Sequence, residues 1–310
     1  MSQNNPLSAI LDKQDFLLLD GAMATELEAR GCNLADSLWS AKVLVENPEL
    51  IREVHLDYYR AGAQCAITAS YQATPAGFAA RDLDEAQSKV LIGKSVELAR
   101  KAREAYLAEN PQAGTLLVAG SVGPYGAYLA DGSEYRGDYQ RSAEEFQAFH
   151  RPRVEALLDA GADLLACETL PNFAEISALA ELLTAYPRAR AWFSFTLRDS
   201  EHLSDGTPLR DVVALLAGYP QVVALGINCI ALENTTAALQ HLHGLTALPL
   251  VVYPNSGEQY DAVSKTWHHH GEHCARLADY LPQWQAAGAR LIGGCCRTTP
   301  KDIAVLKARS

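Results

Sequence analysis

The sequence predicts a (β/α)8 TIM barrel formed by a single domain, residues 1–310. Eight apolar segments of strand length recur along the chain, and helical patterns separate them. The segments are continuously apolar rather than alternating, which is typical of parallel strands buried on both faces. Eight such repeats over about 300 residues fit a barrel. An open doubly wound sheet has the same alternation, but no GxGxxG motif follows the first predicted strand, so we favour the barrel.

The sequence also predicts the bounds of the strands and the positions where several helices begin or end. The predicted strands cover residues 16–21, 64–70, 115–123, 163–170, 190–197, 222–229, 248–255 and 290–296. Pro48 is expected to open one helix, and a capping box formed by Ser142 and Glu145 is expected to open another. The tripeptide Ala-Gly-Ala recurs directly before three of the strands, so Gly62, Gly161 and Gly288 are expected to end helices in the left-handed conformation.

Composition excludes several classes of function. The formal net charge of −11 and the pI of about 5.3 argue against a nucleic-acid binder or a partner of acidic membrane surfaces. No apolar run has membrane-spanning length, and the first residues do not form a signal peptide, so we expect a cytoplasmic protein. Seven widely spread cysteines, an odd number, argue against a disulfide framework.

Three cysteines are predicted to meet at the carboxyl-terminal rim of the barrel, where such folds place their active sites. Cys229 ends the sixth strand, and Cys295 and Cys296 end the eighth after two glycines that permit a bend. Three thiolates with an open fourth position indicate a catalytic zinc site, with one Zn²⁺ per chain. A redox-active vicinal disulfide would leave Cys229 unexplained.

The remaining cysteines and the histidines favour simpler interpretations. Cys65, Cys167 and Cys274 are interpreted as small buried apolar residues. The segment "HHHGEHC", residues 268–274, has His and Cys at metal-ligand spacing, but it lies in the long connection after the seventh strand and is interpreted as a solvated loop.

Two carboxylates also follow buried strands. Asp20 ends the first strand and Glu168 the fourth, where an unpaired charge is costly. They could act as a general acid/base pair or bind a ligand's ammonium group, and Asp20 could instead cap the next helix. Ammonium binding is preferred, because a zinc-activated nucleophile needs no second base. The predicted strands contain no lysine, which disfavours a Schiff-base aldolase.

Several motifs together resemble the homocysteine S-methyltransferase family, over almost the whole chain: "LLLDGAMATEL", "TASYQAT", "GSVGPYGAYLADGSEYRG", "ACETLPN", "GINC", "VVYPNSGE" and "IGGCCRTTP". The resemblance implies a zinc barrel that methylates homocysteine to methionine, with S-methylmethionine or S-adenosylmethionine as donor. It implies that Cys229, Cys295 and Cys296 hold the metal. It further implies that the homocysteine site is formed by Asp20, Gly21, Ala22, Thr68, Glu168 and Asn228.

The donor is expected to bind under the loop after the third strand. Tyr125, Tyr128 and Tyr135 offer aromatic faces that attract a sulfonium cation, as does Tyr139, and Asp131 and Glu134 add negative charge. An ordinary aromatic lid has the same composition, and the family resemblance favours the donor site.

Two other functions remain open. A betaine:homocysteine methyltransferase would use the same barrel, and a non-catalytic zinc- or redox-sensing barrel would use the same thiols. The expected partners are small molecules, homocysteine and a sulfonium donor, with no nucleic acid and no membrane. The sequence does not determine the oligomeric state, although a monomer is favoured.

Overall fold

The computed structural model describes residues 5–309 except 35–37, 39, 258, 262–265 and 269–275. Its centre is an eight-stranded parallel sheet in the order β1-β12-β9-β8-β5-β4-β3-β2. A parallel bridge between Leu19 and Cys65 joins the two edges, so the sheet closes into a barrel. The predicted barrel is therefore confirmed, and the doubly wound alternative is excluded. The strands are β1 (Leu17–Leu18), β2 (Cys65–Ile67), β3 (Leu117–Val122), β4 (Leu164–Leu170), β5 (Ala191–Phe195), β8 (Val222–Asn228), β9 (Leu250–Tyr253) and β12 (Ala289–Ile292).

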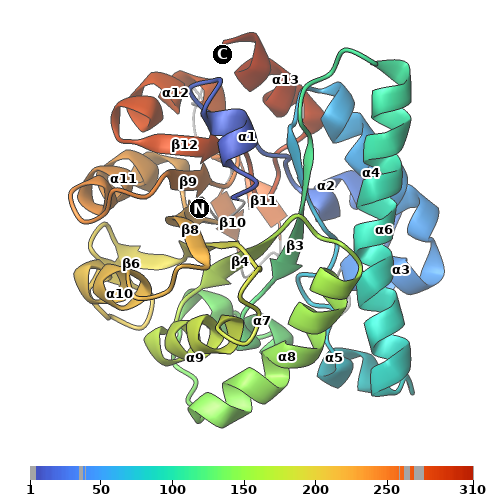
Figure 1. The fold of residues 1–310 in the computed structure, drawn as a ribbon, viewed down its shortest axis with the longest axis horizontal. Coiled ribbons are helices and arrows are strands. Elements are labelled where there is room, and N and C mark those ends of the chain that lie inside the picture. The colour runs from blue at the N-terminus through green and yellow to red at the C-terminus, as the bar shows by residue number, and fades with distance from the viewer. Residues whose placement is uncertain are drawn as a thin grey trace.

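Helices surround this barrel, as Figure 1 shows. The longer ones are α4 (Pro48–Arg60), α6 (Glu85–Glu109), α8 (Ala143–Asp159), α9 (Phe173–Leu183), α10 (Leu209–Leu216), α11 (Thr235–His243), α12 (Leu277–Ala286) and α13 (Pro300–Ala308). The shorter ones are α1 (Ser8–Leu11), α2 (Met23–Ala29), α3 (Ser40–Glu46), α5 (Pro75–Ala79), α7 (Tyr125–Leu129), η1 (Ser133–Tyr135) and η2 (Leu232–Asn234). Two hairpins complete the fold, β6 (Leu197–Asp199) with β7 (His202–Leu203) and β10 (Gln259–Asp261) with β11 (Thr266–His268). Among the described helices, none has the length and apolar character needed to cross a bilayer.

The predicted helix boundaries are confirmed. Pro48 occupies the first turn of α4, and the capping box of Ser142 and Glu145 opens α8. Gly62, Gly161 and Gly288 have φ of 108°, 86° and 86°, in the left-handed region that glycine enters without steric cost. These glycines end α4, α8 and α12 directly before the next strand, which keeps the helix-to-strand connections short.

Alternate strand residues form two separate cores. Leu17, Ala119, Trp192 and Val251 belong to the cluster inside the barrel, whereas their neighbours pack against the helices. Leu7 and Ile10 of the α1 segment join the interior cluster, and this segment precedes β1. The segment therefore closes the amino-terminal end of the barrel, which leaves the carboxyl-terminal end for the site.

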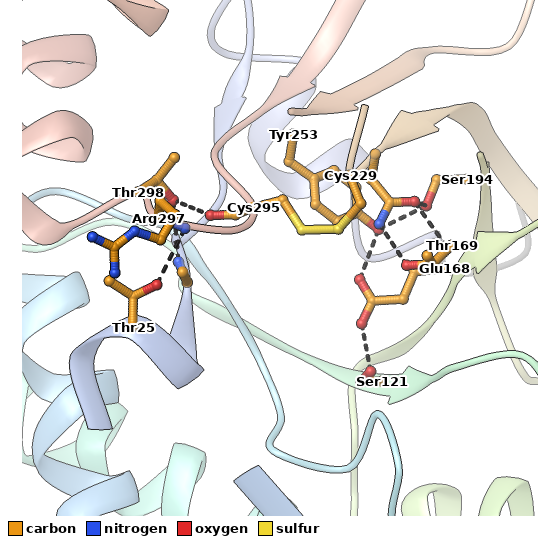
Figure 2. The surroundings of a disulfide bond; sticks show 12 residues. Thr25, Ser121, Glu168, Thr169, Ser194, Cys229, Tyr253, Cys295, Arg297 and Thr298 are labelled. Atoms are coloured by element: carbon orange, nitrogen blue, oxygen red, sulfur yellow. Dashed lines mark hydrogen bonds between the residues drawn. A yellow bond between two sulfur atoms is a disulfide. The ribbon is translucent and has the colours of Figure 1, made fainter. Parts of the chain in front are cut away.

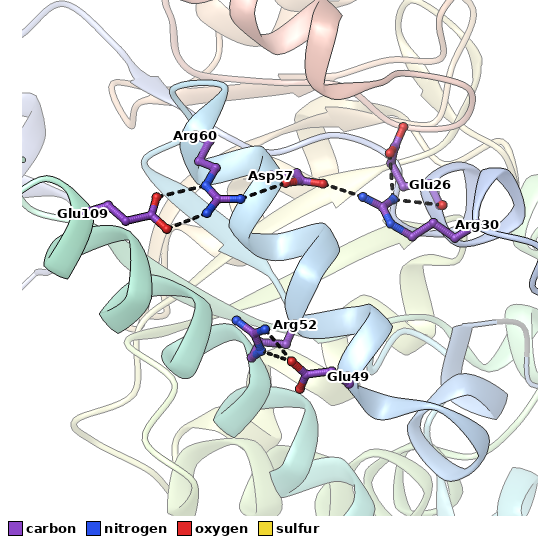
Figure 3. A network of polar contacts seen from close by, with 7 residues as sticks. All are labelled: Glu26, Arg30, Glu49, Arg52, Asp57, Arg60 and Glu109. Carbon is purple, nitrogen blue, oxygen red and sulfur yellow. Dashed lines mark hydrogen bonds and ion pairs between the residues drawn. The ribbon is translucent and has the colours of Figure 1, made fainter.

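A chain of ion pairs links α2, α4 and the end of α6 (Figure 3). Arg30 pairs with Glu26 at 2.9 Å and with Asp57 at 2.5 Å, and Arg60 joins Asp57 at 3.6 Å to Glu109 at 2.5 Å. Exposed pairs of this kind contribute about 0–1 kcal/mol each. Their effect here is to orient α2, whose amino-terminal end reaches the rim of the barrel.

Candidate active site

A pocket opens at the carboxyl-terminal ends of the strands. It contains about 820 Å³ of space, part of it open to solvent. Ten of the twelve residues predicted for the site line it: Asp20, Gly21, Ala22, Thr68, Tyr135, Glu168, Asn228, Cys229, Cys295 and Cys296.

The three predicted metal ligands lie together. Within the described chain, Cys229, Cys295 and Cys296 are the one group that could hold a metal ion, and their sulfur atoms all lie within 4.8 Å of one another. Each is partly buried. Three cysteine sulfurs this close together would, as thiolates, match the donor set of a zinc site with one open position.

Cys295 and Cys296 lie in the loop after β12, and its backbone geometry explains how two adjacent residues share the site. A Cβ at Gly294 would lie 2.4 Å from Thr298 Oγ1, and a Cβ at Gly293 would lie 2.7 Å from the Asp20 carbonyl oxygen. Only glycine therefore permits this close passage of the chain, as the sequence indicated. The Thr298 hydroxyl also donates to the Cys295 carbonyl at 2.6 Å, which closes the turn that presents both thiols. Cys229 reaches the site by a different route, through a left-handed φ of 51° directly after β8.

Cys229 and Cys295 form a disulfide in this structure, with their Cα atoms 5.5 Å apart (Figure 2). The sequence-based expectation of unpaired thiols is thus wrong for these two residues, because the ends of β8 and β12 bring their sulfur atoms into contact. Cys295 and Cys296 do not form a vicinal disulfide, because Cys296 is a free thiol. A metal bound by all three sulfurs requires that this disulfide be reduced.

Glu168 is held inside the pocket by two hydroxyl groups. Ser121 donates to Oε1 at 2.5 Å and Tyr253 donates to Oε2 at 2.9 Å, as Figure 2 shows. The side chain is only 7% exposed. Burial raises its pKa from 4.5 to about 6, although the two hydrogen bonds oppose that shift. The carboxylate is therefore ionised at neutral pH but lacks a full counter-charge.

Asp20 is the second buried carboxylate. Its Oδ2 accepts a hydrogen bond from the Ile67 backbone N–H at 2.8 Å. Burial raises its pKa well above the usual range, and the negative charge of Glu168 raises it further. Two carboxylates that repel each other in one pocket favour a ligand with a positive charge.

The other predicted contacts of the homocysteine site are close to these carboxylates. The Thr68 hydroxyl accepts from the Ser121 N–H at 3.0 Å and shares a hydrogen bond of 2.7 Å with Ser70. The Ala22 N–H, at the start of α2, donates to Thr298 Oγ1 at 3.2 Å. A Cβ at Gly21 would lie 2.8 Å from both that oxygen and the Tyr58 hydroxyl, so the backbone approaches closely there.

Asn228 lines the pocket and also fixes the end of β4. Its Oδ1 accepts from the Thr169 N–H at 2.8 Å and from Ser194 Oγ at 2.7 Å, and its Nδ2 donates to Thr169 Oγ1 at 2.7 Å. These bonds hold Thr169 at a left-handed φ of 60°, directly after Glu168. Asn228 thus determines where the Glu168 side chain enters the pocket.

Sequence reasoning missed the residues that orient Glu168. The Tyr253 hydroxyl accepts a hydrogen bond from Trp192 Nε1 at 3.0 Å, and Ser194 Oγ lies 2.7 Å from it. A usable signal was present, since Val251 and Tyr253 alternate as inward-facing positions of β9 and a tyrosine hydroxyl inside a barrel needs a partner.

The three tyrosines predicted to bind the donor do not all lie in the pocket. Tyr135 lines the pocket. Tyr125 instead packs against Tyr128, Tyr139 and Phe149, with ring centroids 5.0–5.7 Å apart, and its hydroxyl accepts from Arg141 at 2.9 Å. Tyr128 belongs to the same aromatic cluster, and neither Tyr125 nor Tyr128 is among the pocket residues in the described part of the chain.

Other predicted features fall outside the site. Cys65 and Cys167 are fully buried, as expected for small apolar residues. Residues 269–275, which include most of the histidine-rich segment and Cys274, lie outside the described residues. None of the eight barrel strands contains a lysine.

Comparisons with known proteins point to one family. The family model described as Homocysteine S-methyltransferase matches residues 17–310. The chain is 95% identical, over the full length of both, to "Homocysteine S-methyltransferase" of Escherichia coli strain K12. Crystal structures of the E. coli homocysteine methyltransferase MmuM in a metallated and an oxidized form each superpose with a TM-score of 0.92 at 89% identity, covering 99% of this chain and 100% of theirs.

Proposed function

The chain belongs to the homocysteine S-methyltransferase family, and from this premise we propose that it transfers a methyl group from a sulfonium donor to homocysteine, using a zinc site. The observation that carries the proposal is one pocket that contains three convergent cysteine sulfurs and two buried carboxylates. The thiols fit a metal that binds the acceptor sulfur, and the carboxylates fit the acceptor's ammonium group.

Cys229, Cys295 and Cys296 are the proposed ligands of one Zn²⁺ per chain. Soft thiolates select zinc over the hard cations that oxygen ligands bind. Reduction of the Cys229–Cys295 disulfide supplies two of the three thiols, so the metal-binding form requires a reducing compartment, which we take to be the cytoplasm. A zinc ion bound there would lower the pKa of a coordinating thiol enough to ionise it at neutral pH.

Asp20 and Glu168 are proposed to bind the ammonium group of homocysteine, with Thr68 beside them. A positive charge relieves the repulsion between the two carboxylates and lowers the pKa of both. The backbone at Gly21 and Ala22 is proposed to face the carboxylate of the amino acid. Asn228 contributes by holding the strand end that carries Glu168.

The reaction needs little further chemistry from the chain. The homocysteine thiolate attacks the sulfonium methyl group, the new C–S bond forms as the donor C–S bond breaks, and the donor leaves as a neutral thioether. No proton is needed on the leaving group. Opposite charges cancel in the transition state, so a pocket that excludes water favours the reaction.

S-Methylmethionine is the proposed donor, with S-adenosylmethionine weaker because its adenosyl group needs extra room. Tyr135 is the tyrosine proposed to face the sulfonium. Residues 1–310 are proposed to act as one domain that contains both substrate sites.

A donor panel tests the proposal. The reduced, zinc-loaded protein is assayed for methionine formation from homocysteine, with S-methylmethionine, S-adenosylmethionine, betaine and methyltetrahydrofolate at equal concentrations. We expect S-methylmethionine to have the highest kcat/KM, betaine to be poor and methyltetrahydrofolate to be inert. Betaine above both sulfoniums would make the protein a betaine:homocysteine methyltransferase. Zinc binding without turnover of any donor would favour a sensor.

A further inference from the structure

A third carboxylate in the pocket has one oxygen without a hydrogen-bond partner among the described residues. Glu134, in η1, lines the same pocket as Glu168 and the three cysteines. Its side chain is 8% exposed, and within the described residues its Oε2 atom is buried without a hydrogen-bond partner. Buried polar atoms are paired in most proteins, and an unpaired carboxylate oxygen is costly. The presence of this unpaired oxygen in a pocket indicates that Glu134 has a function in ligand binding.

The surrounding loop is built to hold Glu134 in place. Thr196 Oγ1 donates to the Glu134 carbonyl at 2.8 Å. Gly126 of α7 packs so closely on η1 that a Cβ there would lie 2.7 Å from the Glu134 nitrogen. Asn172 Nδ2 donates to the carbonyls of Gly137 and Tyr139 at 2.9 and 3.1 Å, which fixes the far end of the loop. Glu134 is therefore presented to the pocket by a defined turn.

The cation nearest in sequence is already engaged. Arg136 donates from Nε to Asp138 at 3.1 Å and from its terminal nitrogens to the Asp131 carbonyl at 2.8 Å and to Ser133 Oγ at 3.0 Å. The pocket lining, as far as the structure describes it, contains Asp20, Glu134 and Glu168 but no lysine, arginine or histidine. Burial raises the pKa of Glu134, and the charge of Arg136 opposes this rise without cancelling it.

Asp131, another acidic residue of this loop, does not have these properties. Its Oδ1 accepts from the Ser133 N–H at 3.0 Å and from Ser133 Oγ at 2.5 Å, and the residue is exposed. Asp131 thus closes the turn before η1. Of the three acidic residues of this loop, Asp131, Glu134 and Asp138, Glu134 is the one that lines the pocket.

We propose that Glu134 is a specificity-determining residue that attracts the positively charged sulfur of the methyl donor. This inference rests on the proposed function, in which Asp20 and Glu168 are occupied by the ammonium group of homocysteine. A sulfonium donates no hydrogen bond, so a charged oxygen beside it, rather than a hydrogen-bonding array, is the matching group. Tyr71 also lines the pocket. Burial raises the pKa of its hydroxyl group, and the negative charge of Glu134 raises it further.

The expected kinetic signature differs from that of a catalytic residue. The attraction is strongest in the ground state, because the positive charge of the sulfur fades as the methyl group moves. Removal of the Glu134 charge should therefore raise KM for the donor without lowering kcat. The neutral thioether product loses the attraction, so Glu134 also distinguishes donor from product.

Glu134→Gln tests the inference in the zinc-loaded enzyme at saturating homocysteine. We expect KM for S-methylmethionine to rise about ten-fold or more, with kcat unchanged or higher. Donor-competitive inhibition by methionine, which has the same amino-acid end but an uncharged sulfur, should stay within about two-fold of wild type. Glu134→Asp keeps the charge and should lose less donor affinity. Glu104→Gln removes an exposed charge of α6, outside the pocket lining, and should match the wild type.

Each other outcome has a distinct meaning. Equal weakening of S-methylmethionine and methionine would assign Glu134 to the ammonium group of the donor and overturn the sulfonium assignment. An unchanged KM in folded, zinc-loaded Glu134→Gln, with wild-type turnover intact, would refute the inference alone. A wild-type enzyme that uses no sulfonium donor would instead refute the proposed function.

Discussion

Glu168→Gln should make the protein more stable and less able to bind homocysteine. Burial raises the pKa of Glu168 from 4.5 to about 6. Because each pKa unit corresponds to about 1.4 kcal/mol, the ionised carboxylate costs the fold about 2 kcal/mol at pH 7. Glutamine keeps the shape, and its amide can bond to both Ser121 and Tyr253 after their hydroxyl groups rotate. The variant should recover most of that cost while losing the charge that attracts the ammonium group.

The sign of the pH dependence follows from the direction of the shift. A carboxyl group with a raised pKa in the folded state favours folding when it is protonated. The wild type should therefore match the variant near pH 4.5 and lose stability relative to it as the pH rises to about 6, with a constant difference above that. Homocysteine binding should show the opposite trend in the wild type, weakening below about pH 6 as Glu168 takes up a proton.

Two measurements check this reasoning. Urea unfolding of both proteins at pH 5 and pH 7, without substrate or reductant, should give a difference in the free energy of unfolding that grows with pH. Calorimetry on the reduced, zinc-loaded proteins should show homocysteine binding weaker by roughly 1.5–3 kcal/mol in the variant, with the zinc content unchanged. A variant that is less stable at pH 7 would refute the electrostatic cost. Normal homocysteine binding, in Asp20→Asn as well, would refute the ammonium assignment.

Two further predictions concern the metal site. Cys229→Ser or Cys296→Ser should abolish stoichiometric zinc binding, measured by elemental analysis, and methionine formation, while Cys32→Ser, away from the site, should keep both; full activity of a metal-free sample would contradict this. Gly294→Ala should also lose zinc, because the added Cβ would lie 2.4 Å from Thr298 Oγ1. Gly218→Ala, whose added Cβ has its nearest contact at 3.5 Å, should retain zinc. Normal zinc binding by Gly294→Ala would show that the turn tolerates the added methyl group.

The sequence was most informative where local rules determine structure. The continuous apolar segments located all eight strands, because parallel strands buried on both faces need apolar residues throughout. The three Ala-Gly-Ala junctions located helix ends, because a left-handed residue there strongly favours glycine. The convergence of Cys229 with Cys295 followed from the barrel itself, since all strand ends of a parallel barrel meet on one rim.

The parts that could not be predicted depend on side-chain packing between distant strands. Whether Tyr125 faces the pocket or joins an aromatic cluster depends on how α7 lies on its neighbours, which no local pattern encodes. The contrast between Asp131 and Glu134, two acidic residues of one loop, depends on a single turn of η1. The disulfide between Cys229 and Cys295 depends on how closely two strand ends approach each other.

The costly features of this fold gather at the site. Among the described residues, five that are not glycine have positive φ. Of these, Thr169 and Cys229 lie at the ends of β4 and β8, and Arg297 lies in the turn after β12. Such conformations cost about 1–2 kcal/mol each for residues with a Cβ. Buried Glu168 adds an electrostatic cost at the same end of the barrel. Backbone strain and unpaired charge are thus concentrated at this end of the barrel. A simple substitution could remove each of these costs if stability alone mattered, so we infer that bound ligands relieve them.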